Sequence, residues 1–547
     1  MQSEWRLRTF ATLNRVFAAH PRIGTAGAAI LAGGVAACGF QPLSLWPLTL
    51  AAIAVLLELI ARASSGRGCL AIGWCFGLGH FTVGNTWIAT AFTYQANMPA
   101  WLGGIAVFLL SLYLAVFPAL GALGAWLLAR PDRKPGPSRF AALVLAAAAC
   151  WIVSEWMRAW VFTGFAWNPL GIALLGQFGT RGLAIVTPWT GTYGLSGMTV
   201  LLAGAAGACL RAAHRSWLLA PAVLAVALTA LMTLPDPWAA RDPGAIRFSL
   251  IQPDLRQEII DDPRHYEENF VRMARLSLPR DPGEHRVVFW PESGLGDYLR
   301  DGYPPYLYRL YTYAGDPVVA RRRIGRVIGP YGLLLSGAVD LVMVNGDAAA
   351  ARNSVTAIDG EGAVLAGYAK AHLVPYGEYL PMRALLEPLG AARLVAGELD
   401  FRPGPGPRTF DFGTLGEAGI QGGSGIAFSG GGVDPADRPD YIFNPSNDGW
   451  FGAWGPPQHL AQARLRAIEE GLPVLRSTTT GISAVIDAQG IVRTFIGRHV
   501  AGRIDGRIPP PREPTMFARL GNALPLAWAA MLALSAVSVV ALQRRRG

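Results

Sequence analysis

The most constraining feature of this chain is a series of long apolar stretches that occupies most of its first 234 residues. The stretches lie at about 23–40, 43–61, 68–92, 100–129, 139–163, 190–210 and 216–234, with one more near 522–542. About 20 apolar residues are enough for a helix to cross a bilayer. Hydrophobic residues make up 52% of the chain and charged residues 15%, whereas soluble domains average roughly 45–50% and 25%. The pattern predicts a polytopic α-helical membrane bundle of about eight spans.

Basic residues between these stretches predict which side of the membrane each loop occupies. Clusters of Lys and Arg follow the second, fourth and sixth stretches and end the chain, whereas the loops after the first and third stretches carry none. Because Lys and Arg concentrate on the cytoplasmic side, both termini are expected in the cytoplasm. The long polar segment would then lie on the opposite side. This topology also accounts for the net charge of +10, so no nucleic-acid partner is expected.

The polar segment has a different pattern, in which short apolar runs alternate with amphipathic helices. Strands are expected at 248–252, 287–290, 333–335, 341–345, 354–358, 441–444, 474–477 and 484–486, and helices at 267–276 and 459–470. Strands interleaved with helices indicate one α/β domain with buried sheets. We therefore expect a transmembrane domain at 1–234, an inserted α/β domain at 235–520, and a last span with a basic tail at 521–547. No metal-ligand spacing, phosphate loop or dinucleotide fingerprint is present, so no metal or cofactor is expected.

An acid and a base lie near the end of the fifth apolar stretch. Glu155 and Arg158 are three residues apart and therefore share one face of a helix. Charges at membrane depth are usually functional or paired. Two interpretations stay open, an interfacial ion pair and a role in shaping an entrance for lipid. The segment 164–190 that follows contains Gly and Pro and is a candidate for a re-entrant or interfacial piece.

Two motifs in the polar segment carry side chains that suit acyl-transfer chemistry. Glu292 ends the apolar run Val-Val-Phe-Trp-Pro-Glu, where Trp290 and Pro291 would partly desolvate a carboxylate acting as a general base. Lys370 lies in Tyr-Ala-Lys-Ala-His-Leu-Val-Pro-Tyr-Gly-Glu-Tyr, which ends near Glu378. A lysine near a reacting carbonyl stabilises the oxyanion. Taken singly, each is more simply an exposed strand-end carboxylate or a solvated lysine.

Together with their flanking sequences, these motifs resemble those of the bacterial apolipoprotein N-acyltransferase family, membrane members of the nitrilase (carbon–nitrogen hydrolase) superfamily. The matching segments, in order, are EWMRAWVFTGFAW, WPES, YAKAHLVPYGEYLP, FNPSNDGWFG, QHLAQARLRAIEEGLPVLRSTTTGIS and PTMFARLGN. The resemblance implies an eight-helix bundle in the bacterial inner membrane, carrying a periplasmic αββα sandwich. It also implies the reaction, in which an acyl chain moves from phospholipid to an active-site cysteine. The acyl chain then passes to the α-amine of a diacylglyceryl-cysteine lipoprotein.

By the resemblance, Glu292 matches the general base, Lys370 the oxyanion-stabilising lysine, and Glu378 a further acidic residue. The nucleophile of the family is a cysteine in an Ile-Cys-Tyr-Glu run after a strand. That run falls here on Gly-Gly-Ser-Gly, residues 422–425. The position of the cysteine is Gly423, and those of the tyrosine and glutamate are Ser424 and Gly425.

The missing cysteine determines which functions remain open. No cysteine follows Cys209, so the polar segment has no thiol to carry an acyl group as a thioester. We expect lost or altered catalysis, with a non-catalytic homologue that binds phospholipid or diacylated lipoprotein as one alternative. Weaker alternatives are an acyl-enzyme on Ser424, whose hydroxyl would need a local backbone shift, and a hydrolase using water activated by Glu292.

Overall fold

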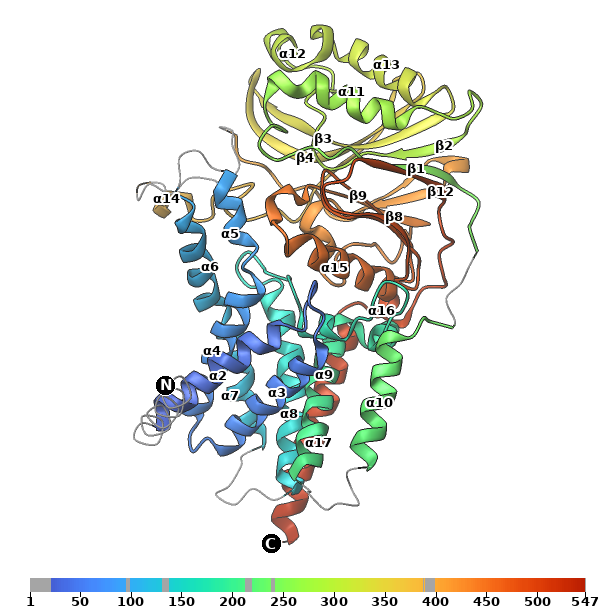
Figure 1. The fold of residues 1–547 in the computed structure, drawn as a ribbon. Coiled ribbons are helices and arrows are strands. Elements are labelled where there is room, and N and C mark those ends of the chain that lie inside the picture. The colour runs from blue at the N-terminus through green and yellow to red at the C-terminus, as the bar shows by residue number, and fades with distance from the viewer. Residues whose placement is uncertain are drawn as a thin grey trace, which may run out of the picture.

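The structure is a computed structural model that describes residues 21–94, 99–129, 137–211, 219–237, 242–386, 388 and 399–546. A helical part and a part built on two β-sheets are stacked one above the other (Figure 1). The helical part contains α2 (Pro21–Ala37), α3 (Trp46–Arg62), α4 (Gly66–Gly84), α5 (Ile88–Ala91), α6 (Trp101–Leu114), α7 (Val116–Ala129), α8 (Pro137–Arg158), α9 (Thr187–Arg211), α10 (Leu219–Thr233) and α17 (Ala523–Arg546). Each apolar stretch of the sequence thus forms helix.

Four helical segments of the described chain are long and apolar enough to cross a membrane, judged by length and composition. They are Trp101–Ala129, Arg139–Arg158, Leu183–Cys209 and Ala523–Arg545. The first of these joins α6 and α7 almost end to end. The apolar stretches near 23–40, 43–61 and 216–234 form helices of 17, 17 and 15 residues. The expected number of about eight spans therefore remains a prediction.

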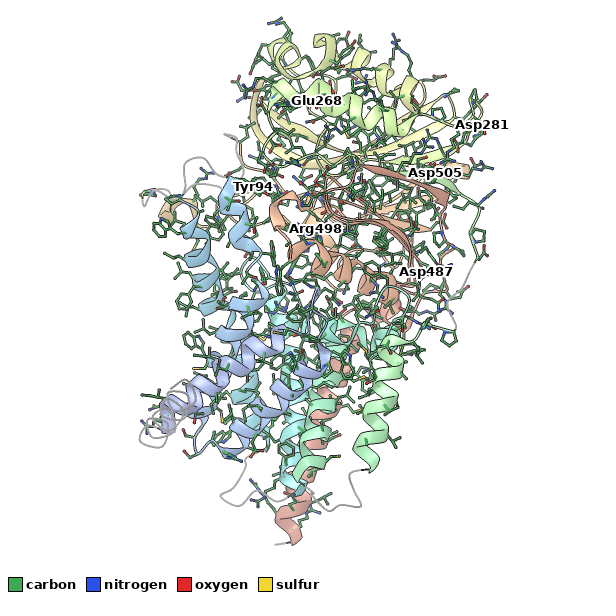
Figure 2. The ribbon with its side chains drawn as sticks, in the orientation of Figure 1. Tyr94, Glu268, Asp281, Asp487, Arg498 and Asp505 are labelled. Carbon is green, nitrogen blue, oxygen red and sulfur yellow. The ribbon has the colours of Figure 1, made fainter. Side chains whose placement is uncertain are left out.

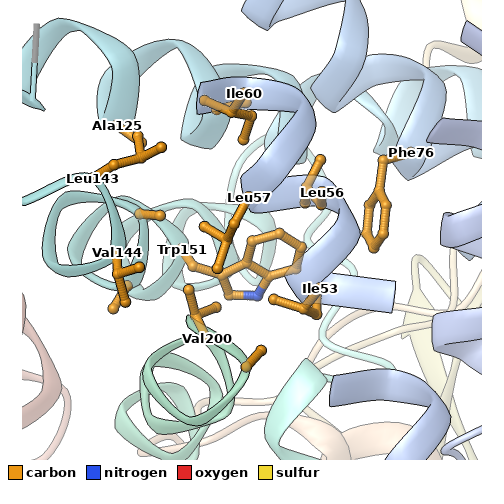
Figure 3. Packing of buried hydrophobic residues seen from close by; sticks show 14 of the residues in the cluster. Ile53, Leu56, Leu57, Ile60, Phe76, Ala125, Leu143, Val144, Trp151 and Val200 are labelled. Carbon is orange, nitrogen blue, oxygen red and sulfur yellow. The ribbon is translucent and has the colours of Figure 1, made fainter. Parts of the chain in front are cut away.

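The helices pack through a core of large side chains and through close backbone contacts at glycine. Trp151 lies among Ile53 and Leu57, and all three are buried (Figure 3). A Cβ atom at Gly33 of α2 would lie 1.9 Å from the backbone oxygen of Phe76 on α4. A Cβ atom at Gly79 of α4 would lie 2.0 Å from the backbone oxygen of Ile30 on α2. Small residues at such positions let two helices in a membrane approach closely.

The second part contains two six-stranded sheets. The first has the order β12-β1-β2-β3-β4-β5 and the second β11-β10-β9-β8-β7-β6. The strands of the first are β1 (Arg247–Gln252), β2 (Arg286–Phe289), β3 (Gly332–Val344), β4 (Asp347–Asp359), β5 (Val364–Ala369) and β12 (Gly502–Arg507). Those of the second are β6 (Thr409–Asp411), β7 (Glu417–Ile420), β8 (Tyr441–Ser446), β9 (Val474–Thr478), β10 (Ser483–Ile486) and β11 (Val492–Ile496). The central strands β1–β2–β3 and β7–β8–β9 are parallel.

Helices cover both outer faces of the paired sheets, giving the α–β–β–α layers that the family resemblance implies (Figure 1). The helices α11 (Tyr266–Ser277) and α13 (Pro317–Ile328) cover the first sheet, with α12 (Pro305–Tyr311) beside them. The helix α15 (Gly455–Glu470) covers the second sheet and faces the helical part. Between the sheets the rings of Phe289 and Phe443 meet with centroids 4.8 Å apart. Their contact belongs to a continuous apolar core.

Two details differ from the pattern expected from the sequence. The runs 333–335 and 341–345 were expected as separate strands, but both belong to the single strand β3. The polar residue Ser336 interrupts the apolar run, yet its side chain is buried and the strand continues through it. The helix α13 was not expected, because three consecutive arginines break up its short apolar pattern.

The two parts are joined by polar and aromatic contacts. The guanidinium of Arg464, on α15, donates to the carbonyl oxygens of Gly176, Gln177 and Thr180 in the helical part at 2.7–2.9 Å. Tyr94, labelled in Figure 2 at the upper end of the helical part, meets the ring of Trp450 edge-on at 5.8 Å. The loop between α8 and α9 thus lies directly against α15.

Candidate functional site

The residues singled out by the sequence come from strands of both sheets and meet at one end of the sandwich. Glu292 follows β2 and Lys370 follows β5, both in the first sheet, whereas Gly423 follows β7 in the second. Glu378 lies farther along the loop after β5. The site is therefore assembled across the two sheets, from residues spread over positions 292–423 of the chain.

Two carboxylates contact the ammonium group of Lys370, and one side-chain amide bridges the two carboxylates. Its Nζ lies 3.0 Å from Glu378 Oε1 and 3.5 Å from Glu292 Oε1. Asn353 Nδ2 donates to the same two oxygens, at 2.8 Å to Glu378 and 2.7 Å to Glu292. The second oxygen of Glu292 accepts from the backbone N–H of Asn447 at 2.9 Å. Each carboxylate is thus fixed by more than one donor.

The charge state of Lys370 follows from these contacts. The side chain is buried, with a relative exposure of 4%. Burial by itself would lower the pKa of Lys370, but the carboxylates of Glu378 and Glu292 outweigh it and raise the pKa above its ordinary value. A cation held between two carboxylates is favoured in its charged form. The site therefore holds a positively charged ammonium at neutral pH.

Gly423 faces the Glu292 carboxylate directly. A Cβ atom built on Gly423 would lie 2.7 and 2.9 Å from the two carboxylate oxygens of Glu292. The φ angle of Gly423 is +46°, a left-handed conformation that side-chain-bearing residues seldom adopt. Any side chain at this position would point at the proposed general base. In the present arrangement the carboxylate occupies the space that such a side chain would need.

A buried polar network of His459, Asp448 and Arg476 contacts the backbone of Gly423. His459 Nε2 lies 3.1 Å from the Gly423 carbonyl oxygen, and His459 Nδ1 lies 3.0 Å from both Asp448 Oδ1 and Arg476 Nη2. Burial and the positive charge of Arg476 lower the pKa of His459. Burial alone would raise the pKa of Asp448, but Arg476 and His459 outweigh it and lower it. His459 therefore links the Gly423 carbonyl to the buried pair of Asp448 and Arg476. Sequence reasoning did not assign these residues a role, although all three lie within the matching segments FNPSNDGWFG and QHLAQARLRAIEEGLPVLRSTTTGIS.

Ser424 is not placed as a nucleophile. Residues Gly423–Ala427 form a short 3-10 helix, closed by the Gly425 N–H donating to the Gly422 carbonyl at 3.0 Å. Ser424 is half-buried, and within the described parts of the chain its hydroxyl makes no hydrogen bond. A serine nucleophile needs an adjacent base. A Cβ at Gly425 would meet no atom within 4 Å, so this turn is open on one side.

Glu155 and Arg158 do not pair with each other directly. Glu155 Oε1 accepts from the Leu170 N–H at 2.7 Å, and Arg158 Nη1 donates to the carbonyl oxygens of Phe165 and Trp167 at 3.0 and 2.8 Å. Both side chains therefore fix the loop after α8. Trp167 in turn donates its indole N–H to a glutamine of α15. The interfacial ion pair is not formed, and the lipid entrance remains a prediction.

Across the ranges that the structure describes, no group of three His, Cys, Asp or Glu side chains is arranged to hold a metal ion. The site can therefore offer a carboxylate base, an ammonium and amide donors. It has no nucleophile at the position where the Glu292 carboxylate points.

Comparison with known proteins gives matches over most of the chain. Residues 32–205 match the apolipoprotein N-acyltransferase N-terminal domain, and residues 266–509 match the carbon-nitrogen hydrolase family. The apolipoprotein N-acyltransferase of Rhodopseudomonas palustris is 32% identical, covering 94% of this chain and 95% of that protein. The one from Bradyrhizobium diazoefficiens is 34% identical, covering 90% and 91%. Among solved structures, a mutant of the Nesterenkonia AN1 amidase from the nitrilase superfamily is similar at 16% identity, with a TM-score of 0.32, over 49% of this chain and 92% of that one.

Proposed function

This chain belongs to the apolipoprotein N-acyltransferase family, and from that premise we propose that it binds the ligands of lipoprotein N-acylation without forming an acyl-enzyme. The ligands are a phospholipid acyl donor and a diacylated lipoprotein in the bilayer. The observation that carries the proposal is Gly423, which faces Glu292 but has no side chain. The carboxylate and ammonium groups of the site are present, whereas the group that would become acylated is absent.

The covalent step of the family chemistry is the one this chain cannot perform in the usual way. A thioester needs a thiolate at the site. The five cysteines are Cys38, Cys69, Cys75, Cys150 and Cys209, all within the N-terminal apolar region and none near Glu292 in the chain. In this proposal Glu292 occupies the position of the family's general base but has no nucleophile to deprotonate. Lys370 keeps its positive charge and would hold a bound carbonyl oxygen, with Glu378 fixing the lysine.

Ser424 is the other residue considered as a nucleophile, and no contact supports it. A nucleophile must lie within hydrogen-bonding distance of the base that activates it. Ser424 has no such contact with any described residue, whereas position 423 faces Glu292. We therefore do not propose a serine acyl-enzyme.

We also propose the membrane arrangement that the sequence predicts. The chain would cross the bacterial inner membrane about eight times, with residues 1–234 and 521–547 forming the transmembrane domain. Residues 235–520 would form the periplasmic domain, and both termini would lie in the cytoplasm. The distribution of Arg and Lys supports this topology. The contacts between α15 and the loop after α8 are compatible with a site close to the membrane surface.

The proposal is tested in a bacterium depleted of its own N-acyltransferase. The chain is expressed in this strain, and the N-terminus of a lipoprotein is analysed by mass spectrometry. We expect only the diacylated form, together with non-covalent phospholipid on the purified protein in native mass spectra. A third acyl chain on the lipoprotein, or an acyl adduct on this protein, would refute the proposal. The Lys370→Met variant should retain less phospholipid if the site is the place of binding.

A further inference from the structure

A small cavity lies beside Lys370, along the turn that contains Gly423. Its volume is about 20 Å³, which is room for a water molecule or one small polar group. The side chains of Tyr368, Lys370, His372 and Gln421 line it, together with several glycines. The family chemistry does not assign a ligand contact to Gln421, and nothing in the proposed function uses it so far.

The Gln421 side chain is buried and has no partner. Its relative exposure is 4%, and neither Oε1 nor Nε2 has a hydrogen-bond partner within the described ranges. Its main chain is fixed, because its N–H donates to the Phe443 carbonyl at 2.9 Å and its carbonyl accepts from Asn444 Nδ2 at 2.6 Å. Buried amide groups nearly always have partners. An amide with both ends unpaired beside a cavity is available to bind a polar group that enters it.

The absence of a side chain at Gly432 leaves room for the Gln421 amide. A Cβ atom at Gly432 would lie 1.7 Å from Gln421 Nε2. The amide therefore lies against a residue that must be glycine for it to stay there. The steric contact is with the far end of a flexible side chain, so alanine at this position would displace the amide and leave the main chain in place.

The hydrogen-bonding groups around the cavity select one class of ligand. Lys370 Nζ has three N–H bonds and contacts Glu378 and Glu292, which leaves one donor free for a ligand. Gln421 adds donors at Nε2 and an acceptor at Oε1. An ester carbonyl would satisfy the donors and leave Oε1 unpaired. A carboxylate would place a negative charge beside two others. A neutral amide supplies both a carbonyl oxygen and an N–H.

We propose that Gln421 and Lys370 hold the amide of an N-acylated amine in this cavity without a covalent bond. The carbonyl oxygen accepts from Lys370 or Gln421 Nε2, and the amide N–H donates to Gln421 Oε1. This inference rests on the proposed function and deepens it, because an N-acyl amide is the kind of product that N-acyl transfer forms. The chain would then bind that product where its relatives make it.

The test compares N-methyloctanamide with its ester counterpart methyl octanoate, on the full-length protein in detergent micelles. The two probes differ only in an N–H replaced by an oxygen. We expect the amide to bind about 10-fold or more tightly than the ester, since the ester leaves a buried acceptor unpaired. The Gln421→Leu variant should lose this preference. The same variant without ligand should unfold at a higher temperature than the natural protein, because it no longer buries an unpaired amide.

Two further variants test whether the position of the Gln421 amide, rather than its removal alone, determines the preference. Gly432→Ala retains Gln421 but displaces its amide, so it should also lose the preference. Gln462→Leu is the matched control, because Gln462 is a buried glutamine with an unpaired Oε1 that does not line the cavity. Its preference for the amide should be unchanged.

Equal affinity for the two probes, no binding of either, or a preference that survives in Gln421→Leu would overturn the inference. Intact-mass spectra of the same samples detect any acyl adduct, and so distinguish failure of this inference from failure of the proposed function. An acyl adduct on the protein ends the non-covalent proposal even where the amide preference holds. Absence of the amide preference in the unsubstituted protein, without any adduct, ends only the assignment of Gln421.

Discussion

At position 423, a side chain and the Glu292 carboxylate would compete for one space. The Cβ of Gly423→Cys would lie 2.7 Å from a carboxylate oxygen, and the φ angle of +46° adds strain of about 1 kcal/mol for a residue other than glycine. Both effects require the turn and the carboxylate to shift. We therefore expect Gly423→Cys alone not to restore N-acylation, as measured by mass spectrometry of a lipoprotein from a depleted strain.

The control for this experiment replaces the whole turn. A variant with Ile-Cys-Tyr-Glu at residues 422–425 removes three glycines and with them the freedom of the turn to adopt the present conformation. It should form an acyl-enzyme more readily than the single variant. Robust triacylation by the single variant would show that the turn adjusts to a side chain without help from its neighbours.

Lys370 gives a prediction about pH and stability. Its pKa is raised in the folded state because the two carboxylates outweigh burial. Its contribution to stability is therefore complete below the ordinary lysine pKa of about 10.4 and is lost as the pH rises through the raised value. The Lys370→Met variant leaves two buried carboxylates uncompensated, so we expect it to be about 3–5 kcal/mol less stable at pH 7. The measurement is the free energy of unfolding of both proteins from pH 7 to pH 11.

The difference between the two proteins should narrow above about pH 10.4. The comparison is simple because the chain contains only one other lysine, Lys134. A difference that stays constant with pH would show that Lys370 stabilises the site by packing rather than by charge.

At the scale of elements, α15 packs between the sheets and the helical part, and its Arg464 donates hydrogen bonds to both. The guanidinium donates to Gly176, Gln177 and Thr180 in the loop before α9 and to Gly490 in the sheet part. Arg464→Met keeps the length of the side chain and removes all four bonds. Unpaired buried carbonyls cost about 1–3 kcal/mol each. We expect a loss of about 4 kcal/mol or more in unfolding free energy, measured in detergent.

The matched control is Arg498→Met, because Arg498 makes two long hydrogen bonds within the sheet part, 3.4 Å to the Ala453 carbonyl and 3.3 Å to His499 Nε2. It should change the free energy of unfolding by less than about 1 kcal/mol. Equal effects of the two variants would mean that Arg464 acts through general packing of α15.

The elements that the sequence predicted share a strong local pattern. Long apolar stretches, the run before Glu292 and the amphipathic pattern of α11 all identify their elements without knowledge of the fold. The edge strands β5 and β6 could not be predicted, because the β5 sequence Val-Leu-Ala-Gly-Tyr-Ala does not alternate between apolar and polar residues and β6 has only three residues. The same holds for the site. Glu292 and Lys370 follow from motifs, whereas the unpaired amide of Gln421 appears only once the two sheets are brought together.

At the scale of the whole molecule, the distribution of Arg and Lys predicts the membrane topology. The chain ends in Arg544, Arg545 and Arg546, and the turn between β3 and β4 at Asn345 and Gly346 is exposed. Green fluorescent protein fused after the last residue should fluoresce, because it folds in the cytoplasm. Alkaline phosphatase inserted at the β3–β4 turn should be active, because it needs an oxidising compartment for its disulfides. Phosphatase fused at the C-terminus should be inactive. Activity there, or inactivity at the turn in a well-expressed fusion, would reverse the proposed orientation and place the Lys370 site in the cytoplasm, away from any lipoprotein that has crossed the membrane.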